Sequence, residues 1–471
     1  MSVSSIRTRL RSAPLTPGLE LGLVAGMMLV AALLRLLFIN TAPGWELDEV
    51  VYAKIGQNML RTGAPSLVGG APYLSHPPFY FSLLSAWFGM FGAGILQARI
   101  FAALSQLVAL LVAYRLVRLV AGRAAALITL LFLVLEGWLV FTARIGWIEN
   151  GQLILIGGAL IAYQHAITRN GAWRYALAGA LMGASIIYKH IALFLVVFVA
   201  LEWFVRGRGR AREYGMLAGS LALVVAAYVG GMVAVWGDAF IQQNMNQVLR
   251  TFGAVDSPGL NYDLGTAISA AASRYWMFFS TVIVFVVGVP LALYRGYQLV
   301  RRRGGQPSIL VSWAVAVVVF LGVIALRSPH YYILLLFPLL CLLAEELEHA
   351  PQLHVRRMRI AGAFVALGLV TWGLRFGLPH DNVLASIQTY AAANIPGDAH
   401  VFSTEPVCTV ILQPCEKLEG KTPERVAAAI GQSDWVLAYE SRTQPFPKVP
   451  GQTQATFSGF KDTITVVRLA K

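Results

Sequence analysis

The chain has 471 residues, of which 57% are apolar and only 13% are charged, and its formal net charge at pH 7 is +14. An average soluble domain carries about 25% charged residues, so this composition excludes an ordinary soluble protein. The positive charge does not indicate a nucleic-acid partner, because the Lys and Arg residues stand in short clusters between apolar runs and form no basic face or tail.

Apolar segments recur along the chain, and most can cross about 30 Å of hydrocarbon at about 1.5 Å per helical residue. We therefore predict a mainly α-helical, polytopic membrane protein with about eleven transmembrane helices. The predicted spans are 19–38, 97–119, 124–142, 151–167, 173–188, 190–205, 214–236, 276–299, 308–326, 330–348 and 358–376.

Basic residues at alternate connections set the predicted topology. Each inner connection in this map carries a cluster of arginines, whereas cations in the outer connections are spread over longer stretches. Because cytoplasmic loops are enriched in Lys and Arg, we predict a multi-pass cell-membrane protein with a cytoplasmic N-terminus. The first apolar run follows three arginines and lacks a small-residue cleavage site, which favours a retained anchor. One long helix over 173–205 would invert everything downstream, and the later basic loops argue against it.

The outer stretch between the first two spans, residues 39–96, is too long for a connection without structure of its own. Residues 48–61 and 78–90 have helical spacing with apolar residues on one side. We predict two helices that lie in the membrane interface. A pair of plugging helices without chemistry would give the same pattern.

The composition changes near residue 379, and we predict a transmembrane domain over 1–378 and a small extracytoplasmic α/β domain over 379–471. Within the second domain the sequence predicts a turn at 394–398, strands at 400–403 and 435–439, and a helix at 423–430.

Two of the three cysteines lie in this predicted domain. Cys408 and Cys415 are separated by six residues, whereas Cys341 lies alone in a predicted span. In an oxidising compartment we expect a disulfide between Cys408 and Cys415; the alternative is two free thiols.

Three carboxylates, Glu46, Asp48 and Glu49, follow the first span directly. Ionisable residues at the membrane edge are costly, so each is a candidate functional residue. On a helix that begins here, Asp48 and Tyr52 share a face, and Glu49 is turned by about 100°. We identify Asp48 and Glu49 as candidate catalytic residues and Tyr52 as a candidate substrate contact. Asp48 could also be only a helix N-cap, with Glu49 in the favourable first turn.

Two further clusters lie at the same predicted face. His76 precedes Pro77 and Pro78, which impose an extended entry into the second interfacial helix; its imidazole can contact an anion or act only as a local hydrogen-bond donor. Arg144 and Glu149 stand beside a span boundary and indicate a site in which Glu149 is paired. Snorkelling explains Arg144 readily and Glu149 less readily.

More cations follow on the predicted outer face, and each alone can be an interfacial anchor. Together with the carboxylates they form a plausible site for a phosphate-bearing lipid. The candidate contacts to the phosphate or the chain of such a lipid are His76, Arg144, Lys189, His190, Arg250, Arg274, His330 and Tyr331.

The order of these features resembles that of the C-type (GT-C) glycosyltransferases. It comprises an apolar span, Asp48-Glu49-x-x-Tyr52, the turn at Pro77-Pro78, a second interfacial helix, and an Arg144-to-Glu149 segment after the third span. The branch it is most similar to is that of the protein O-mannosyltransferases and the bacterial lipid A aminoarabinose transferases, glycosyltransferase families 39 and 83. The likeness covers roughly residues 19–205 in motif, and the later spans in hydropathy and in the segment from Tyr331 to Pro338.

The resemblance implies the GT-C fold and the transfer of a sugar from a polyprenyl-phosphate donor to an extracytoplasmic acceptor, with inversion. The acceptor would be a cell-envelope glycan, lipid or protein. Asp48 takes the role of general base. Glu149 is the third candidate catalytic residue; it stands where the family often has an aspartate, and we expect it to support the acceptor or the cation network. The branch commonly has a lysine at the position of His76, so Lys189 or an arginine is expected to contact the donor phosphate instead.

The sequence contains no Asp-x-Asp, Gly-rich phosphate loop or zinc-ligand spacing, which favours a lipid-linked donor over a nucleotide sugar. No cofactor is predicted; Glu46, Asp48 and Glu49 could hold a divalent cation, but this is not the favoured reading. Two other classes stay open. A transporter or flippase should show repeated halves, which we do not see. A non-catalytic lipid-binding scaffold would have no need of Asp48.

Overall fold

The computed structural model gives the positions of most of the chain. The residues it describes are 16–40, 43, 46–67, 71–169, 171–207, 209–253, 279–301, 308–324, 329–349, 360, 362–370, 383–403, 405–411, 415–417, 433–441, 449–458 and 462–469.

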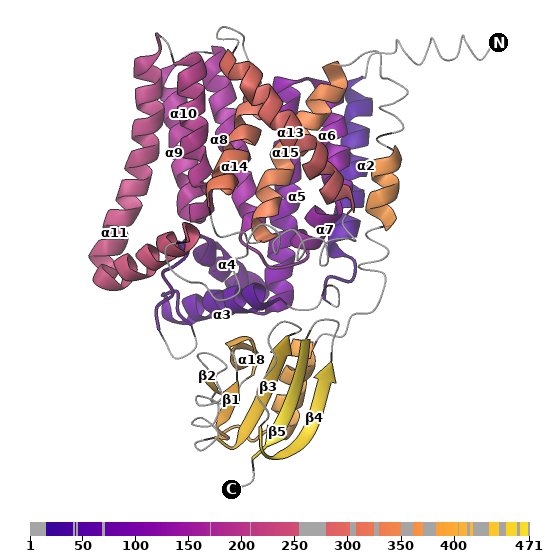
Figure 1. Cartoon of the computed structure of the whole chain (residues 1–471), viewed down its shortest axis with the longest axis vertical. Helices are drawn as coiled ribbons and strands as arrows, with labels where there is room; N and C mark the ends of the chain where they lie inside the picture. The colour runs from indigo at the N-terminus through magenta and orange to yellow at the C-terminus, as the bar shows by residue number, and fades with distance from the viewer. Residues whose placement is uncertain are drawn as a thin grey trace, which may run out of the picture.

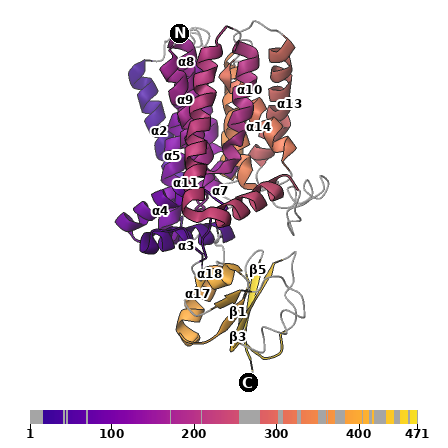
Figure 2. The ribbon, with the colours of Figure 1, turned by 90° about the vertical axis from the view of Figure 1, so that its left-hand side faces the viewer.

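Long helices stand side by side in a bundle, and two shorter helices, α3 and α4, lie across one end of it (Figure 1). A small sheet lies beyond α3, and the view in Figure 2 shows the same three layers. The bundle helices are α2 (Pro17–Leu36), α5 (Ile95–Val120), α6 (Arg123–Leu135), α7 (Gly137–Ala143), α8 (Glu149–Arg169), α9 (Ala172–Tyr188), α10 (Phe194–Arg206), α11 (Ala211–Thr251), α13 (Phe279–Arg301), α14 (Ile309–Val323) and α15 (Tyr332–His349).

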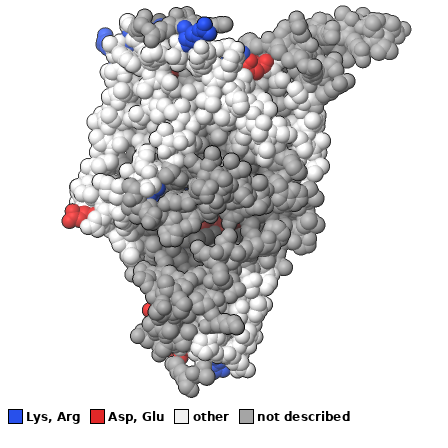
Figure 3. All heavy atoms as spheres, in the orientation of Figure 1, with Lys and Arg blue, Asp and Glu red and all other residues white. Residues whose placement is uncertain are grey.

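The helices overlap the predicted apolar segments up to residue 348, whereas only 360 and 362–370 of the predicted span 358–376 are among the described residues. The predicted count of about eleven spans is not confirmed. Among the described residues, four helices, α2, α5, α11 and α13, are long and apolar enough to cross a membrane, and α6 with α7 would make a fifth. The others are shorter or carry polar residues at their ends. On the face shown in Figure 3, Lys and Arg stand at the upper end of the bundle above a mostly white flank, as in a membrane protein.

The predicted span over 124–142 is broken at Glu136, where α6 and α7 meet at 62°. Glu136 is fully buried and caps α7 by accepting a hydrogen bond from the Leu139 backbone N–H. The buried guanidinium of Arg35 donates to the carbonyls of Leu133 and Val134, which the break leaves without helical partners. The break can exist inside the bundle because a side chain from another helix binds the backbone carbonyls that lose their helical partners.

The helices predicted over 48–61 and 78–90 are present, as α3 (Leu47–Thr62) and α4 (Pro78–Phe91). A capping box between Glu46 and Glu49 begins α3, and Pro78 begins α4 at the first helical position. The two helices approach closely because α3 has a glycine at position 56. A β-carbon there would lie 3.0 Å from the side chain of Leu84 in α4.

The C-terminal part forms a five-stranded mixed sheet in the order β2-β1-β3-β5-β4. The central strand β3 pairs in parallel with β1 and antiparallel with β5. The strands predicted at 400–403 and 435–439 are present as β1 and β3, whereas the helix predicted at 423–430 lies outside the described residues. The elements are α17 (Val383–Asn394), β1 (Val401–Ser403), α18 (Glu405–Val410), β2 (Cys415–Lys417), β3 (Trp435–Ser441), β4 (Gln452–Ser458) and β5 (Asp462–Arg468).

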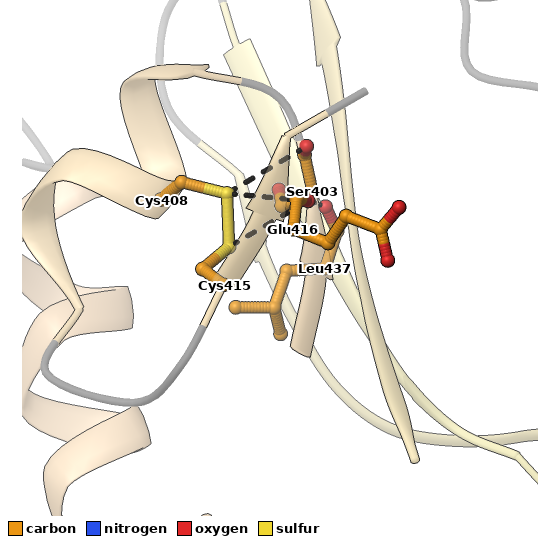
Figure 4. Close-up of a disulfide and its surroundings, with 5 residues drawn as sticks. All are labelled: Ser403, Cys408, Cys415, Glu416 and Leu437. Carbon is orange, nitrogen blue, oxygen red and sulfur yellow. Dashed lines mark hydrogen bonds between the residues drawn. A yellow bond between two sulfur atoms is a disulfide. The ribbon is translucent and has the colours of Figure 1, made fainter. Parts of the chain in front are cut away.

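The predicted disulfide joins Cys408 of α18 to Cys415 of β2 (Figure 4). The helix α18 also packs against α3. Val50 of α3 belongs to the same hydrophobic core as Val407 of α18 and the buried residues of α17 and the sheet. The disulfide therefore lies in the element that connects the sheet to the helix carrying Asp48.

Candidate active site

Asp48, the second residue of α3, accepts a hydrogen bond at Oδ2 from His330 Nε2 at 3.0 Å. His330 lies in η3 (Pro329–Tyr331), the short 3-10 helix before α15, and its ring meets that of Trp147 edge-on with the centroids 4.0 Å apart. The Asp48 side chain remains 39% exposed. The structure thus orients one carboxylate oxygen and leaves the group accessible.

The surroundings of Asp48 keep its carboxyl ionised. Desolvation by the neighbouring side chains would raise its pKa, but the hydrogen bond from His330 and the positive charges of His330 and Lys189 outweigh it and lower the pKa to about 2. At neutral pH the group is therefore an anion that can accept a proton.

Lys189 lies at the end of α9, where its Nζ is 2.6 Å from Glu149 Oε1 at the start of α8. Both side chains are buried. Gln152, one helical turn after Glu149, donates from Nε2 to the backbone carbonyls of Lys189 and Ser185 at 2.6 and 3.1 Å. The prediction that Glu149 is paired is confirmed, and its partner is Lys189.

His76 is held by two tyrosines. Its Nδ1 is 3.0 Å from the Tyr73 hydroxyl, and its Nε2 is 3.5 Å from the hydroxyl of Tyr52. Burial, followed by repulsion from Lys189 and His190, lowers the His76 pKa well below its ordinary value. The imidazole is therefore neutral at physiological pH and offers a hydrogen bond, not a charge.

An open pocket lies beside these groups. The Lys189 ammonium stands at its wall, 6.0 Å from the ring centroid of Tyr52 and 5.8 Å from that of Tyr331. Tyr331 lines the pocket and directly follows His330, the partner of Asp48. The pocket therefore lies beside the Asp48–His330 pair. Residues that line it include Ser75, His76, Pro77, Lys189, His190, Tyr331, Gln247, Val248, Thr251 and Phe252.

Two of the predicted site residues, Glu49 and Arg144, form hydrogen bonds in the protein interior and lie away from the pocket. Glu49 is fully buried and receives both arms of the Arg99 guanidinium, at 2.5 and 2.9 Å, together with the Gly146 backbone N–H at 3.1 Å. Arg144 is also fully buried and donates to the Leu34 carbonyl at 2.9 Å. Neither lines the pocket.

The remaining predicted cations differ in position. Arg250 lies in the last turn of α11, next to the pocket residue Thr251. Its guanidinium is near enough to interact electrostatically with the Tyr331 hydroxyl. Arg274 lies outside the described residues. Within the part of the chain that the structure describes, no three His, Cys, Asp or Glu side chains gather as metal ligands would.

Sequence reasoning missed two residues here, Arg99 and Trp147. Arg99 is a charge near the outer end of an apolar span, and such residues are costly enough to have marked it as a partner for a carboxylate. Nothing in the sequence marks Trp147 as the neighbour of His330, because the contact joins two distant segments.

Comparisons with known proteins agree with this architecture. Residues 75–236 match the sequence family described as dolichyl-phosphate-mannose-protein mannosyltransferase. The chain is 26% identical over 378 residues to the undecaprenyl phosphate-alpha-4-amino-4-deoxy-L-arabinose arabinosyl transferase of Pseudomonas savastanoi pv. phaseolicola. This alignment covers 73% of the present chain. The match spans 66% of that relative, just under two thirds of its length.

Two solved structures share the fold. The crystal structure of ArnT from Cupriavidus metallidurans bound to undecaprenyl phosphate aligns with a TM-score of 0.62 and 15% identity, over 96% of this chain and 98% of that one. The Archaeoglobus fulgidus oligosaccharyltransferase aligns with a TM-score of 0.58 and 14% identity, over 91% and 69%. The chain thus has the fold of these two solved structures, which agrees with the fold that the sequence predicted, and its long apolar helices are those of a multi-pass membrane protein.

Proposed function

We propose that this chain, with its GT-C membrane fold, is a glycosyltransferase that moves a sugar from a polyprenyl-phosphate donor to an extracytoplasmic acceptor with inversion. The observation that carries the proposal is an ionised, accessible carboxylate, Asp48, oriented by His330 beside a pocket with Lys189 in its wall. The named relative, an undecaprenyl phosphate aminoarabinose transferase, and the undecaprenyl phosphate-bound ArnT structure support this class of donor.

Asp48 is the general base of the proposed reaction. The acceptor oxygen attacks the anomeric carbon, the bond from that carbon to the phosphate oxygen breaks, and polyprenyl phosphate leaves with the bonding electron pair. The acceptor proton passes to Asp48, whose other oxygen is held by His330. A donor phosphate beside Lys189 brings negative charge near Asp48 and raises its affinity for that proton.

Lys189 is the proposed contact to the donor phosphate. Its ammonium lies 6.0 Å from the ring centroid of Tyr52 and 5.8 Å from that of Tyr331, and it is paired with Glu149. The neutral imidazole of His76 can add a hydrogen bond from the same wall of the pocket. Glu149 therefore serves the cation, which is one of the two roles predicted for it.

The site and the C-terminal part are proposed to face the outer compartment. The C-terminal sheet and α3 lie at the same end of the bundle (Figure 1). A disulfide between Cys408 and Cys415 fits an oxidising compartment. The basic loops predicted at the opposite end fit the cytoplasm. We further propose that residues 379–471 form a domain that contributes to acceptor recognition.

The test compares the purified parent with Asp48→Asn, using a radiolabelled polyprenyl-phosphate sugar and cell-envelope extract as the source of acceptor. We expect transfer to fall by about 100-fold or more, the usual contribution of a general base. Asp238→Asn, which removes an exposed carboxylate of α11, is the matched control and should transfer normally.

The possible outcomes separate the two parts of the proposal. Equal transfer by Asp48→Asn and the parent would show that Asp48 is not the base. No transfer by the parent would contradict the glycosyltransferase assignment itself and favour a scaffold or transporter.

A further inference from the structure

Helix α11 is divided at Gly237, whose backbone angles, φ 50° and ψ −129°, are not helical and are rarely adopted by residues with a side chain. The segment after it, residues 238–251, turns away from the bundle axis and runs at the level of α4 (Figures 1 and 2). We call this segment the α11 arm. The Phe240 side chain near its start is buried, and its ring centroid lies 6.0 Å from that of Tyr228 in the first part of α11.

Two adjacent amides of the α11 arm bind the backbone of the segment 71–77. Gln243 accepts the Leu74 N–H at Oε1, at 2.8 Å, and donates from Nε2 to the Pro72 carbonyl at 2.9 Å. Asn244 donates from Nδ2 to the Leu74 carbonyl at 3.0 Å. Together they satisfy both backbone groups of Leu74, as a neighbouring strand would.

The segment held in this way forms one wall of the donor pocket. Ser75, His76 and Pro77 line the pocket directly after Leu74, whose side chain is fully buried. The α11 arm contributes Gln247, Val248 and Thr251 to the same pocket, one and two helical turns after Gln243. The distance between these two walls therefore depends on the bonds made by Gln243 and Asn244.

We propose that Gln243 and Asn244 are positioning residues that lock the segment 71–77 to the α11 arm and thereby set the shape of the pocket for the polyprenyl phosphate. The proposal rests on the proposed function for the identity of the ligand. Neither amide is needed for the chemistry, since neither is among the pocket-lining residues. Their contribution is to the order of the pocket before the donor arrives, which lowers the cost of binding.

The first measurement is amide hydrogen exchange of the peptide containing residues 71–77. In the parent the Leu74 amide is bonded to Gln243, so we expect slow exchange there and exchange at least tenfold faster in Gln243→Ala. Gln242→Ala is the matched control, because the neighbouring glutamine is exposed, and should leave exchange unchanged. Unchanged exchange in Gln243→Ala would overturn the proposal.

The second measurement is binding of undecaprenyl phosphate to the full-length protein, followed by native mass spectrometry, which needs no transfer activity. Gln243→Ala loses both hydrogen bonds that fix this wall of the pocket, so we expect roughly tenfold weaker binding. Gln243→Glu keeps the acceptor for Leu74 but loses the donor to Pro72; it should give a smaller loss and serves if the alanine variant does not fold.

Binding equal to that of the parent, together with faster exchange, would show that the lock does not shape the pocket and would overturn the proposal. Undecaprenyl phosphate binding that depends on Gln243 in a parent without transfer activity would support the lock while contradicting the proposed function. The two failures are therefore distinguishable.

Discussion

The neighbours Asp48 and Glu49 were both predicted to be catalytic, and Glu49→Gln tests whether their roles differ as the structure indicates. The Glu49 carboxylate and the Arg99 guanidinium are both 0% exposed and form a bidentate pair. Glutamine keeps the volume but removes the negative charge and replaces one acceptor by a donor. Arg99 then remains as a buried charge without its counter-ion, a change that costs about 3 to 5 kcal/mol of folding free energy.

The assay is thermal unfolding of the detergent-purified protein, run beside the transfer assay. We expect a fall of several degrees in the melting temperature of Glu49→Gln, whereas Asp48→Asn, which alters a side chain that is 39% exposed, should melt within about a degree of the parent. Transfer by the remaining folded Glu49→Gln should be far above that of Asp48→Asn. A Glu49→Gln protein that melts like the parent but transfers nothing would refute this reasoning and restore Glu49 as a catalytic residue.

Three other variants test the roles of the pocket cation, of His76 and of the disulfide. Lys189→Gln should weaken binding of undecaprenyl phosphate by about tenfold or more, measured by native mass spectrometry, because it removes the buried cation of the pocket. His76→Gln should bind within about threefold of the parent, and its binding ratio to the parent should stay constant between pH 6.5, the ordinary pKa of histidine, and about pH 8. The reason is that the His76 pKa lies well below its ordinary value, so no proton is gained in this range; a ratio that changes with pH would contradict it. Cys408→Ser should lower the melting temperature and increase amide exchange in α18 and in the first turns of α3, where Val50 shares its core, but should leave exchange in α9 unchanged.

Local signals were sufficient to predict the helices α3 and α4. The capping box of Glu46 and Glu49 and the proline at position 78 act within a few residues, and both helices begin where the sequence predicted. Pairing of Cys408 with Cys415 was also predictable, because the two residues lie close in the sequence. In each case the atoms that decide the structure are neighbours along the chain.

Long-range contacts decided the features that sequence reasoning could not reach. The break at Glu136 depends on Arg35, which lies on another helix and binds the released carbonyls. A hydropathy pattern records only that 124–142 is apolar. The same limit applies to the orientation of Asp48, since His330 comes from the far end of the bundle sequence. Ionisable residues mark where a membrane protein has polar contacts, but they do not say with which partner.

Both charged groups of the proposed chemistry already have partners in the structure, and this bears on how a donor would bind. Lys189 is paired with Glu149, and Asp48 with His330. A phosphate that approaches Lys189 must therefore share the ammonium with Glu149. Glu149 is 1% exposed, and its Oε2 makes no hydrogen bond to any of the described residues, so a partial loss of Lys189 would leave a buried carboxylate poorly satisfied. Leaving that carboxylate poorly satisfied is costly, so the pairing of Lys189 with Glu149 opposes a complete transfer of the ammonium to the phosphate.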